Sequence, residues 1–448
     1  MRILHYFLGF PPYRSGGLTK FAYDLMVSQA KNNDDVFALW PGKIKFFYDK
    51  VSIKKRKSIN GIESFELINP LPVPLDEGIL YVEKYTKKCD EMVYRKFLES
   101  IEPDVIHIHT LMGLHQEFVA IAKKLNIKTV FTTHDYFGIC PKVTLFKNGN
   151  VCDCDNNCID CVNCNKTALS INKIKLMQAP IYRKFKNNFF VAKLRKKHRQ
   201  KFLETNSNIS LRDPSYVEES EKYIRLRNYY LEIFNSIDLF HFNSTQTKEI
   251  YNRYFRPNKS KVISITHQNI EDNRNLNTWK YTGKLRISYL SPPNTFKGYN
   301  LLCEVLDYLW KKGKRDFELN LYSSVYNKKD YMKIHEEGYT YDQLPEIFNN
   351  TDILVAPSIG YETYGFTVLE ALSFGVPVLI SNRVGAKDIV KNSGIIIDFE
   401  SISNFRQILE TLDSSKLSHL RDNIVNLELP LWQDFLKEIY SLYKEEFN

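Results

Sequence analysis

The stretch that decides the fold starts with Asp352-Ile-Leu-Val-Ala-Pro-Ser358 and continues as Glu362-Thr-Tyr-Gly-Phe-Thr-Val-Leu-Glu370. Its first five residues form a short apolar run, which predicts a buried strand that Pro357 and Ser358 end. From Gly365 the apolar residues follow helical spacing, and Val376-Pro-Val-Leu-Ile380 predicts a second buried strand. Strand, loop, helix and strand in this order predict a parallel βαβ unit.

The corner between loop and helix carries the candidate chemistry. The N–H groups of Gly365, Phe366 and Thr367 would lie at a helix N-terminus, which suits a phosphate. Glu362 comes just before the helix, and Glu370 lies about one and a half turns inside it. Carboxylates accept hydrogen bonds, so both suit sugar hydroxyls. The plain alternative is one charge at a helix end and one solvated glutamate.

Two glutamates with seven residues between them, followed by Ala-Leu-x-x-Gly-x-Pro-Val, resemble the donor-site signature of retaining glycosyltransferases of family 4. The resemblance implies an α/β fold of the GT-B type, in which two Rossmann-like, doubly wound domains face each other across a cleft. It implies that Glu362 contacts hydroxyls of the transferred sugar and that Glu370 binds the ribose of the nucleotide. It also places the backbone of 365–367 near the donor.

Composition and charge narrow the class of protein. The chain has 448 residues, 43% of them apolar and 25% charged, which predicts a globular protein of two domains. No apolar run reaches about 18 residues, and the N-terminus has no signal-peptide pattern, so we expect a cytoplasmic protein. The net charge of +10 favours an anionic partner, such as a nucleotide donor, an anionic membrane surface or nucleic acid.

We expect three parts along the chain. Residues 1–266 would form an N-terminal, acceptor-side Rossmann-like domain with a cysteine-rich and basic insertion at about 138–235. Residues 267–430 would form the C-terminal domain that binds the nucleotide sugar, after a polar, irregular segment. The amphipathic segment 431–448 resembles the C-terminal helix of the family, which crosses back to the first domain.

The first domain offers a glycine-rich loop and two histidines. A strand, a loop ending in Gly16-Gly17 and a helix resemble the loop of the family that closes over the donor diphosphate, which makes Gly17 a donor-site candidate. His109 and His134 follow predicted strands. Thr-Thr-His134-Asp resembles the family segment with a functional histidine near the transferred sugar, so His134 is a catalytic candidate. For His109 an acceptor-binding role and a structural role both stay open.

Lys297 follows a predicted strand and precedes Gly298 and a predicted helix. A lysine at such a corner can neutralise a diphosphate, and the Lys-Gly step resembles the family pattern. The sequence departs from the family at Ser291-Pro292, near the place where the family usually has Gly-Arg. A cation that would assist departure of the diphosphate is therefore missing.

Two further features concern the insertion. Its cysteines could hold a structural zinc or be reduced thiols: Cys140, Cys152, Cys154, Cys158, Cys161 and Cys164. The basic stretch 171–201 contains no acidic residue and has interleaved apolar residues, which fits either a helix on an anionic membrane or a solvated arm. No RNA-binding motif accompanies this charge, so we expect no nucleic-acid partner.

The sequence thus predicts a retaining glycosyltransferase that moves a sugar from a UDP- or GDP-sugar to a hydroxyl of a sugar or lipid-linked acceptor. The expected product is a surface polysaccharide or glycolipid, made in the cytoplasm or on the inner face of the membrane. The family resemblance implies a front-face mechanism without a catalytic metal. Two alternatives are a nucleotide-sugar epimerase and a catalytically silent subunit that binds a sugar nucleotide.

Overall fold

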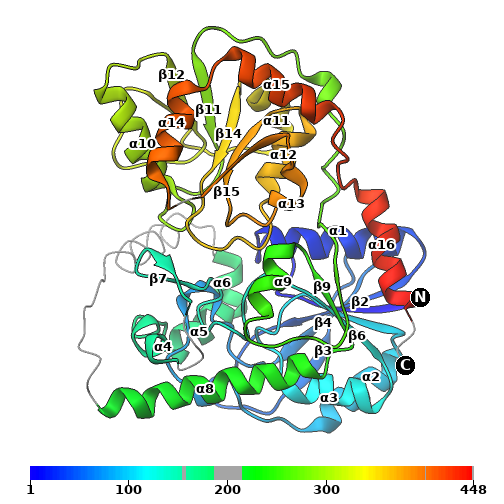
Figure 1. Ribbon diagram of the computed structural model, residues 1–448. Coiled ribbons are helices and arrows are strands. Elements are labelled where there is room, and N and C mark those ends of the chain that lie inside the picture. Colours follow the sequence, from blue (N-terminus) through cyan, green and yellow to red (C-terminus); the bar gives the residue numbers. More distant parts are fainter. Residues whose placement is uncertain (154–157, 186–213, 399, 446–448) are drawn as a thin grey trace.

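A computed structural model describes residues 1–153, 158–185, 214–398 and 400–445. Two separate sheets dominate it, one in each half of the chain (Figure 1). The sheet of the N-terminal half has the order β10-β9-β6-β5-β1-β2-β4-β3, and only the β3–β4 pair is antiparallel. Its strands are β1 (Arg2–Tyr6), β2 (Asp35–Pro41), β3 (Ser52–Lys55), β4 (Glu63–Ile68), β5 (Val105–Ile108), β6 (Lys128–Thr132), β9 (Leu239–Phe242) and β10 (Ser260–Val262).

The sheet of the C-terminal half has six strands, and all of its pairs are parallel. Its order is β13-β12-β11-β14-β15-β16, so the chain reverses direction across the sheet between β11 and β14. Ligands of open parallel sheets bind beside such a reversal, at the carboxyl ends of the strands. The strands are β11 (Leu285–Tyr289), β12 (Phe317–Leu321), β13 (Met332–Ile334), β14 (Ile353–Ala356), β15 (Val378–Ser381) and β16 (Gly394–Ile397).

Helices cover both sheets, as a doubly wound α/β fold requires. In the N-terminal half they are α1 (Gly17–Lys31), α2 (Glu91–Ile101), α3 (Gln116–Lys124), α4 (Ile159–Cys164), α5 (Ile171–Gln178), α6 (Pro180–Phe185), α8 (Pro214–Asn235) and α9 (Thr245–Tyr251). In the C-terminal half they are α10 (Tyr299–Lys311), α11 (Leu344–Asn349), α12 (Phe366–Ser373), α13 (Lys387–Val390), α14 (Ile402–Thr411), α15 (Ser414–Val425) and α16 (Trp432–Lys444).

Short elements complete the described chain. The 3-10 turns are η1 (Leu75–Glu77), η2 (Val82–Lys84), η3 (Arg274–Leu276) and η4 (Tyr341–Gln343). A hairpin of β7 (Phe146–Lys147) and β8 (Asn150–Val151) stands apart from both sheets. None of the helices described is both long and apolar enough to cross a bilayer.

The last helix, α16, packs on the N-terminal half beside α1 (Figure 1). Trp432 Nε1 donates to Ser28 Oγ at 2.9 Å, and Lys128 Nζ donates to the Tyr443 carbonyl at 2.6 Å. Its apolar face joins a core cluster that also contains Phe21 and Val368, one from each half. The C-terminal helix therefore connects the two halves through a shared apolar core.

Candidate active site

Lys297 and Glu362 meet at the carboxyl ends of β11 and β14. The Asn294 side chain accepts a hydrogen bond from the Lys297 backbone N–H at 2.8 Å, which fixes the loop. Lys297 Nζ donates to Glu362 Oε2 at 2.6 Å, and Ser358 Oγ donates to Glu362 Oε1. Because Glu362 is 9% exposed and held at both oxygens, its carboxylate and the ammonium beside it have a fixed place.

Helix α12 begins next to this pair. Its N-cap, Gly365, has φ +117, a conformation that L side chains rarely adopt, and an added Cβ would lie 2.9 Å from Val384 Cγ1. The N–H groups of the first turn, at Phe366 and Thr367, have no acceptor inside the helix. This corner therefore presents backbone donors and the positive end of a helix, both suited to a phosphate.

Glu370 lies in α12 and is 3% exposed. Its Oε1 accepts from His267 Nε2 at 3.2 Å, because His267 Nδ1 accepts from the Asn269 N–H at 3.3 Å. Its Oε2 is buried and has no hydrogen-bond partner of ordinary geometry among the described residues, although the Tyr341 hydroxyl, whose pKa burial and then Glu370 raise, lies near it. A buried carboxylate oxygen without a donor is costly, so Glu370 is suited to accept a hydroxyl from a ligand. His267 lies 103 residues from its partner, so no local sequence pattern pointed to it.

The N-terminal half reaches this corner through α1. A Cβ on Gly17 would lie 3.1 Å from Phe366 Cε2, so the start of α1 touches the start of α12. One turn further, Lys20 Nζ lies 5.0 Å from the centre of the Tyr341 ring. Gly17 is thus placed beside the candidate phosphate corner, where a side chain would crowd Phe366.

His134 follows β6 and lies at the same junction. Its carbonyl accepts from Thr363 Oγ1 at 3.1 Å, which places it against the loop before α12. Its ring is half-buried and packs on Phe21, and burial lowers the pKa of His134 to about 3. The imidazole is therefore neutral at physiological pH, so that one ring nitrogen donates a hydrogen bond and the other accepts one.

For His109 the structure favours the structural alternative over direct contact with an acceptor. The residue is fully buried, and both ring nitrogens have partners: His5 Nδ1 at 3.0 Å and His134 Nε2 at 3.3 Å. An acceptor cannot reach either nitrogen without breaking these bonds. His109 instead lies directly behind His134.

The junction is fastened by residues that the sequence analysis did not single out. Ser244 Oγ donates to the Thr363 carbonyl at 2.8 Å, and Gln246 Nε2 donates to the carbonyls of Glu362 and Arg383 at 2.8 Å each. Gly385 packs here too, since a Cβ would lie 2.2 Å from the Thr363 carbonyl oxygen. The end of β9 thereby fixes the loop that carries Glu362.

The cysteines do not form a metal cluster among the residues described. The structure brings no three of their sulfurs within 4.8 Å of one another, while Cys154 lies outside the described residues, so the zinc hypothesis stays a prediction. Burial raises the pKa of the Cys164 thiol to about 11. This value favours the protonated thiol in the absence of a metal.

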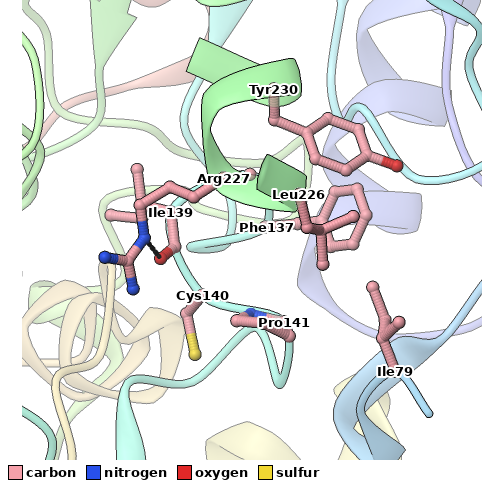
Figure 2. A pocket seen from close by; sticks show the side chains of 9 residues that line it. Ile79, Phe137, Ile139, Cys140, Pro141, Leu226, Arg227 and Tyr230 are labelled. Carbon is pink, nitrogen blue, oxygen red and sulfur yellow. Dashed lines mark hydrogen bonds between the residues drawn. The ribbon is translucent and has the colours of Figure 1, made fainter. Parts of the chain in front are cut away.

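A pocket beside α8 is separate from the candidate active site (Figure 2). It is mostly apolar, and Arg227 Nε donates to the Ile139 carbonyl at its edge, at 3.0 Å. Its lining contains none of the candidate site residues: Ile79, Phe137, Gly138, Ile139, Cys140, Pro141, Leu226, Arg227 and Tyr230. We assign no role in donor binding to this pocket.

Two Rossmann-like sheets whose strand ends meet at one site define the GT-B class of glycosyltransferases. Comparison with solved structures agrees. An E. coli structure titled trehalose-6-phosphate, bound with UDP-2-fluoro glucose, has a TM-score of 0.56 at 12% identity, with both chains covered fully. WaaG, a glycosyltransferase of lipopolysaccharide biosynthesis, has a TM-score of 0.51 at 12% identity, with 99% of this chain and 100% of that chain covered.

Sequence comparison places the C-terminal half in a known family. Residues 293–426 match the family described as glycosyl transferases group 1. An uncharacterized 42.6 kDa protein of the Klebsiella pneumoniae cps region is 22% identical over 75% of this chain and 72% of its own length. An E. coli UDP-Gal:alpha-D-GlcNAc-diphosphoundecaprenol alpha-1,3-galactosyltransferase is 30% identical over 22% of this chain and 27% of its own length. Residues 293–426 thus match the group 1 glycosyltransferase family, and the chain has the GT-B fold, as the sequence led us to expect.

Proposed function

We propose that this enzyme transfers a sugar, with retention of configuration, from a UDP- or GDP-sugar to a hydroxyl of a lipid-linked acceptor. One observation carries the proposal: the buried Oε2 of Glu370 has no hydrogen-bond partner of ordinary geometry among the described residues. On the same helix the free N–H groups of the first turn lie next to the Lys297–Glu362 pair. A carboxylate for a sugar before α12, donors for a diphosphate at its start and an acceptor for a ribose inside it thus follow one another along the chain.

Each residue then has a stated task. When the bond between the sugar C1 and the diphosphate oxygen breaks, its electron pair stays on the diphosphate. Lys297 and the N–H groups at the start of α12 stabilise that charge. Glu362 orients the sugar hydroxyls, and His134 contacts the sugar near C1. The acceptor oxygen attacks C1 from the face of the sugar that the diphosphate leaves, and it gives its proton to the departing diphosphate.

The relatives support the substrate class. One structural neighbour is bound with UDP-2-fluoro glucose, and another is in complex with UDP and glucose. The E. coli relative transfers from UDP-Gal to a diphosphoundecaprenol-linked sugar, and the Klebsiella relative belongs to a cps region. These names favour a UDP-sugar, a lipid-linked acceptor and a role in surface polysaccharide synthesis for this chain.

A lipid-linked acceptor would require the enzyme to work at a membrane. Side chains of Phe46, Phe47 and Tyr48 are 54%, 103% and 52% exposed, and Lys175 Nζ lies 5.4 Å from the centre of the Phe46 ring. Leu176 on α5 is 54% exposed. Exposed aromatic residues beside lysines fit the interface of an anionic bilayer. Residues 186–201 of the predicted basic stretch lie outside the described residues.

Flotation tests this membrane contact. We expect binding to vesicles that contain anionic lipid and weaker binding to neutral ones. Phe46→Ser with Phe47→Ser should weaken the binding, whereas Tyr326→Ser, which removes a side chain 71% exposed in the C-terminal half, should not. Equal flotation of all three proteins would contradict this part of the proposal.

The transfer reaction is tested with a panel of UDP- and GDP-sugars, with and without polyprenyl-diphosphate-linked sugars. We expect release of the nucleotide to accelerate with one acceptor, and the product to keep the donor's anomeric configuration by NMR. Conversion of the donor sugar without any acceptor would indicate the epimerase alternative. Nucleotide binding without any release would indicate the silent subunit.

A further inference from the structure

A single chain of hydrogen bonds runs through the N-terminal half and ends at His134. It starts at a backbone carbonyl, passes through strands β9, β6 and β5, crosses to α16 and α1, and returns through β1 and the residue that follows β5. Its members, in order, are Ile263, His241, Thr132, His107, Tyr443, Gln29, His5, His109 and His134.

The direction of the first bonds follows from the carbonyl. The Ile263 oxygen can only accept, so His241 Nε2 carries a proton and donates to it at 2.8 Å. A neutral His241 then accepts at Nδ1, and Thr132 Oγ1 donates to it at 2.9 Å. A hydroxyl has one proton, so Thr132 must accept from His107 Nε2 at 2.7 Å.

The directions of the next hydrogen bonds, which pass through α16, follow in the same way. His107 Nδ1 accepts from the Tyr443 hydroxyl at 2.6 Å. The Tyr443 oxygen is left to accept from Gln29 Nε2 at 3.2 Å, which turns Gln29 Oε1 toward His5. His5 Nε2 therefore donates to Gln29 Oε1 at 2.7 Å.

The last two bonds reach the candidate site. His5 Nδ1 accepts from His109 Nε2 at 3.0 Å, and His109 Nδ1 accepts from His134 Nε2 at 3.3 Å. These hydrogen-bond directions require neutral imidazole rings, and burial keeps the rings neutral. Desolvation lowers the pKa of His5 and His241 to about 4 and holds that of His107 and His109 well below the usual value.

The three histidines His5, His107 and His109 also have the spacing of a metal site, with ligand atoms within 4.8 Å of one another. The chain uses all six of their ring nitrogens: those of His107 bond Thr132 and Tyr443, and His5 and His109 share one proton between them. A metal would need three free lone pairs here. The cluster is therefore better explained as a hydrogen-bonded chain.

We propose that this chain fixes the tautomer of His134, so that Nε2 carries the proton and Nδ1 is the acceptor offered to the transferred sugar. His109, His5, Gln29 and Tyr443 are then positioning residues. No described residue donates to His134 Nδ1, and a sugar hydroxyl can. The sugar contact rests on the proposed function, whereas the tautomer is a property of the protein alone.

NMR of the full-length protein with 15N-labelled histidine tests the tautomer without any ligand. The ring signals of His134 are identified by their loss in His134→Asn. We expect the wild-type protein to show a protonated Nε2 and an unprotonated Nδ1. A protonated Nδ1 at His134 would overturn the proposal, whatever the enzyme transfers.

Tyr443→Phe tests whether the chain sets this state. The variant removes the link between His107 and Gln29, so the Gln29 amide can rotate and His134 should show both tautomers. Turnover should fall about threefold to tenfold, as expected for one lost hydrogen bond, with little change in KM. Tyr440→Phe is the matched control. The Tyr440 hydroxyl, on the same helix, donates to Asp34, which is not a member of the hydrogen-bonded chain. An unchanged His134 spectrum in folded Tyr443→Phe would contradict the proposal.

Discussion

Replacing Lys297 by methionine is the most informative change, because it removes one charge and keeps the length of the side chain. Lys297 Nζ is 2.6 Å from Glu362 Oε2, and its side chain is 26% exposed. Loss of one preorganised donor to developing negative charge costs about 3 kcal/mol, or about two orders of magnitude in rate. We expect kcat to fall about a hundredfold, and KM for the donor to change less, since the charge grows in the transition state.

Nucleotide release measured over a range of donor concentrations separates kcat from KM. Lys284→Met is the control, because Lys284 pairs with Glu318 at 3.0 Å on the same sheet, with a side chain 49% exposed. An exposed pair contributes about 0–1 kcal/mol to stability, so this variant should keep its activity. Full turnover in Lys297→Met would refute the role of Lys297 in charge stabilisation.

Two other predictions concern stability. Burial raises the pKa of Asp135 to about 7, so its protonated form is favoured in the folded state; stability from this group is present below about pH 4 and is lost as the pH rises through 7. As the pH rises from 4 to 8, the free energy of unfolding of Asp135→Asn should therefore increase by up to about 4 kcal/mol relative to that of the wild type, measured by urea unfolding. A difference between the two proteins that stays constant with pH would contradict this. Gly298→Ala should cost more than about 2 kcal/mol, because its Cβ would lie 1.8 Å from the Pro357 oxygen at φ +73. Gly313→Ala, at φ +94 with nothing within 4 Å, should cost about 1 kcal/mol, and equal losses would show that the contact with Pro357 does not matter.

Local patterns were enough to predict the βαβ unit at 352–380. The apolar run became β14, the helical spacing became α12, and the second run became β15, two residues later than its first apolar residue. Glycine at 365 marked the helix start correctly, because only a residue without a Cβ fits that φ. Such features depend on residues that are close in sequence, and a local sequence pattern therefore predicts them.

Pairings between distant residues could not be predicted in the same way. His267 meets Glu370 only because the segment after β10 folds across α12, and Tyr443 meets His107 only because α16 packs on the N-terminal half. A partial signal for the histidine chain did exist: His107 and His109 are two residues apart in a strand and so share one face. The register that pairs His5 with His107 was needed to complete it.

The most direct test of the account is donor binding, measured as a thermal shift with UDP, GDP, ADP, CMP and common UDP- and GDP-sugars. A ligand at 100 times its dissociation constant should add about 2.7 kcal/mol to the free energy of unfolding. We predict a clear shift with one nucleotide and its sugars, and its loss in Glu370→Ala, which removes the buried Oε2. No shift with any of these compounds in a folded sample, or an equal shift in Glu370→Ala, would contradict the donor site described for α12.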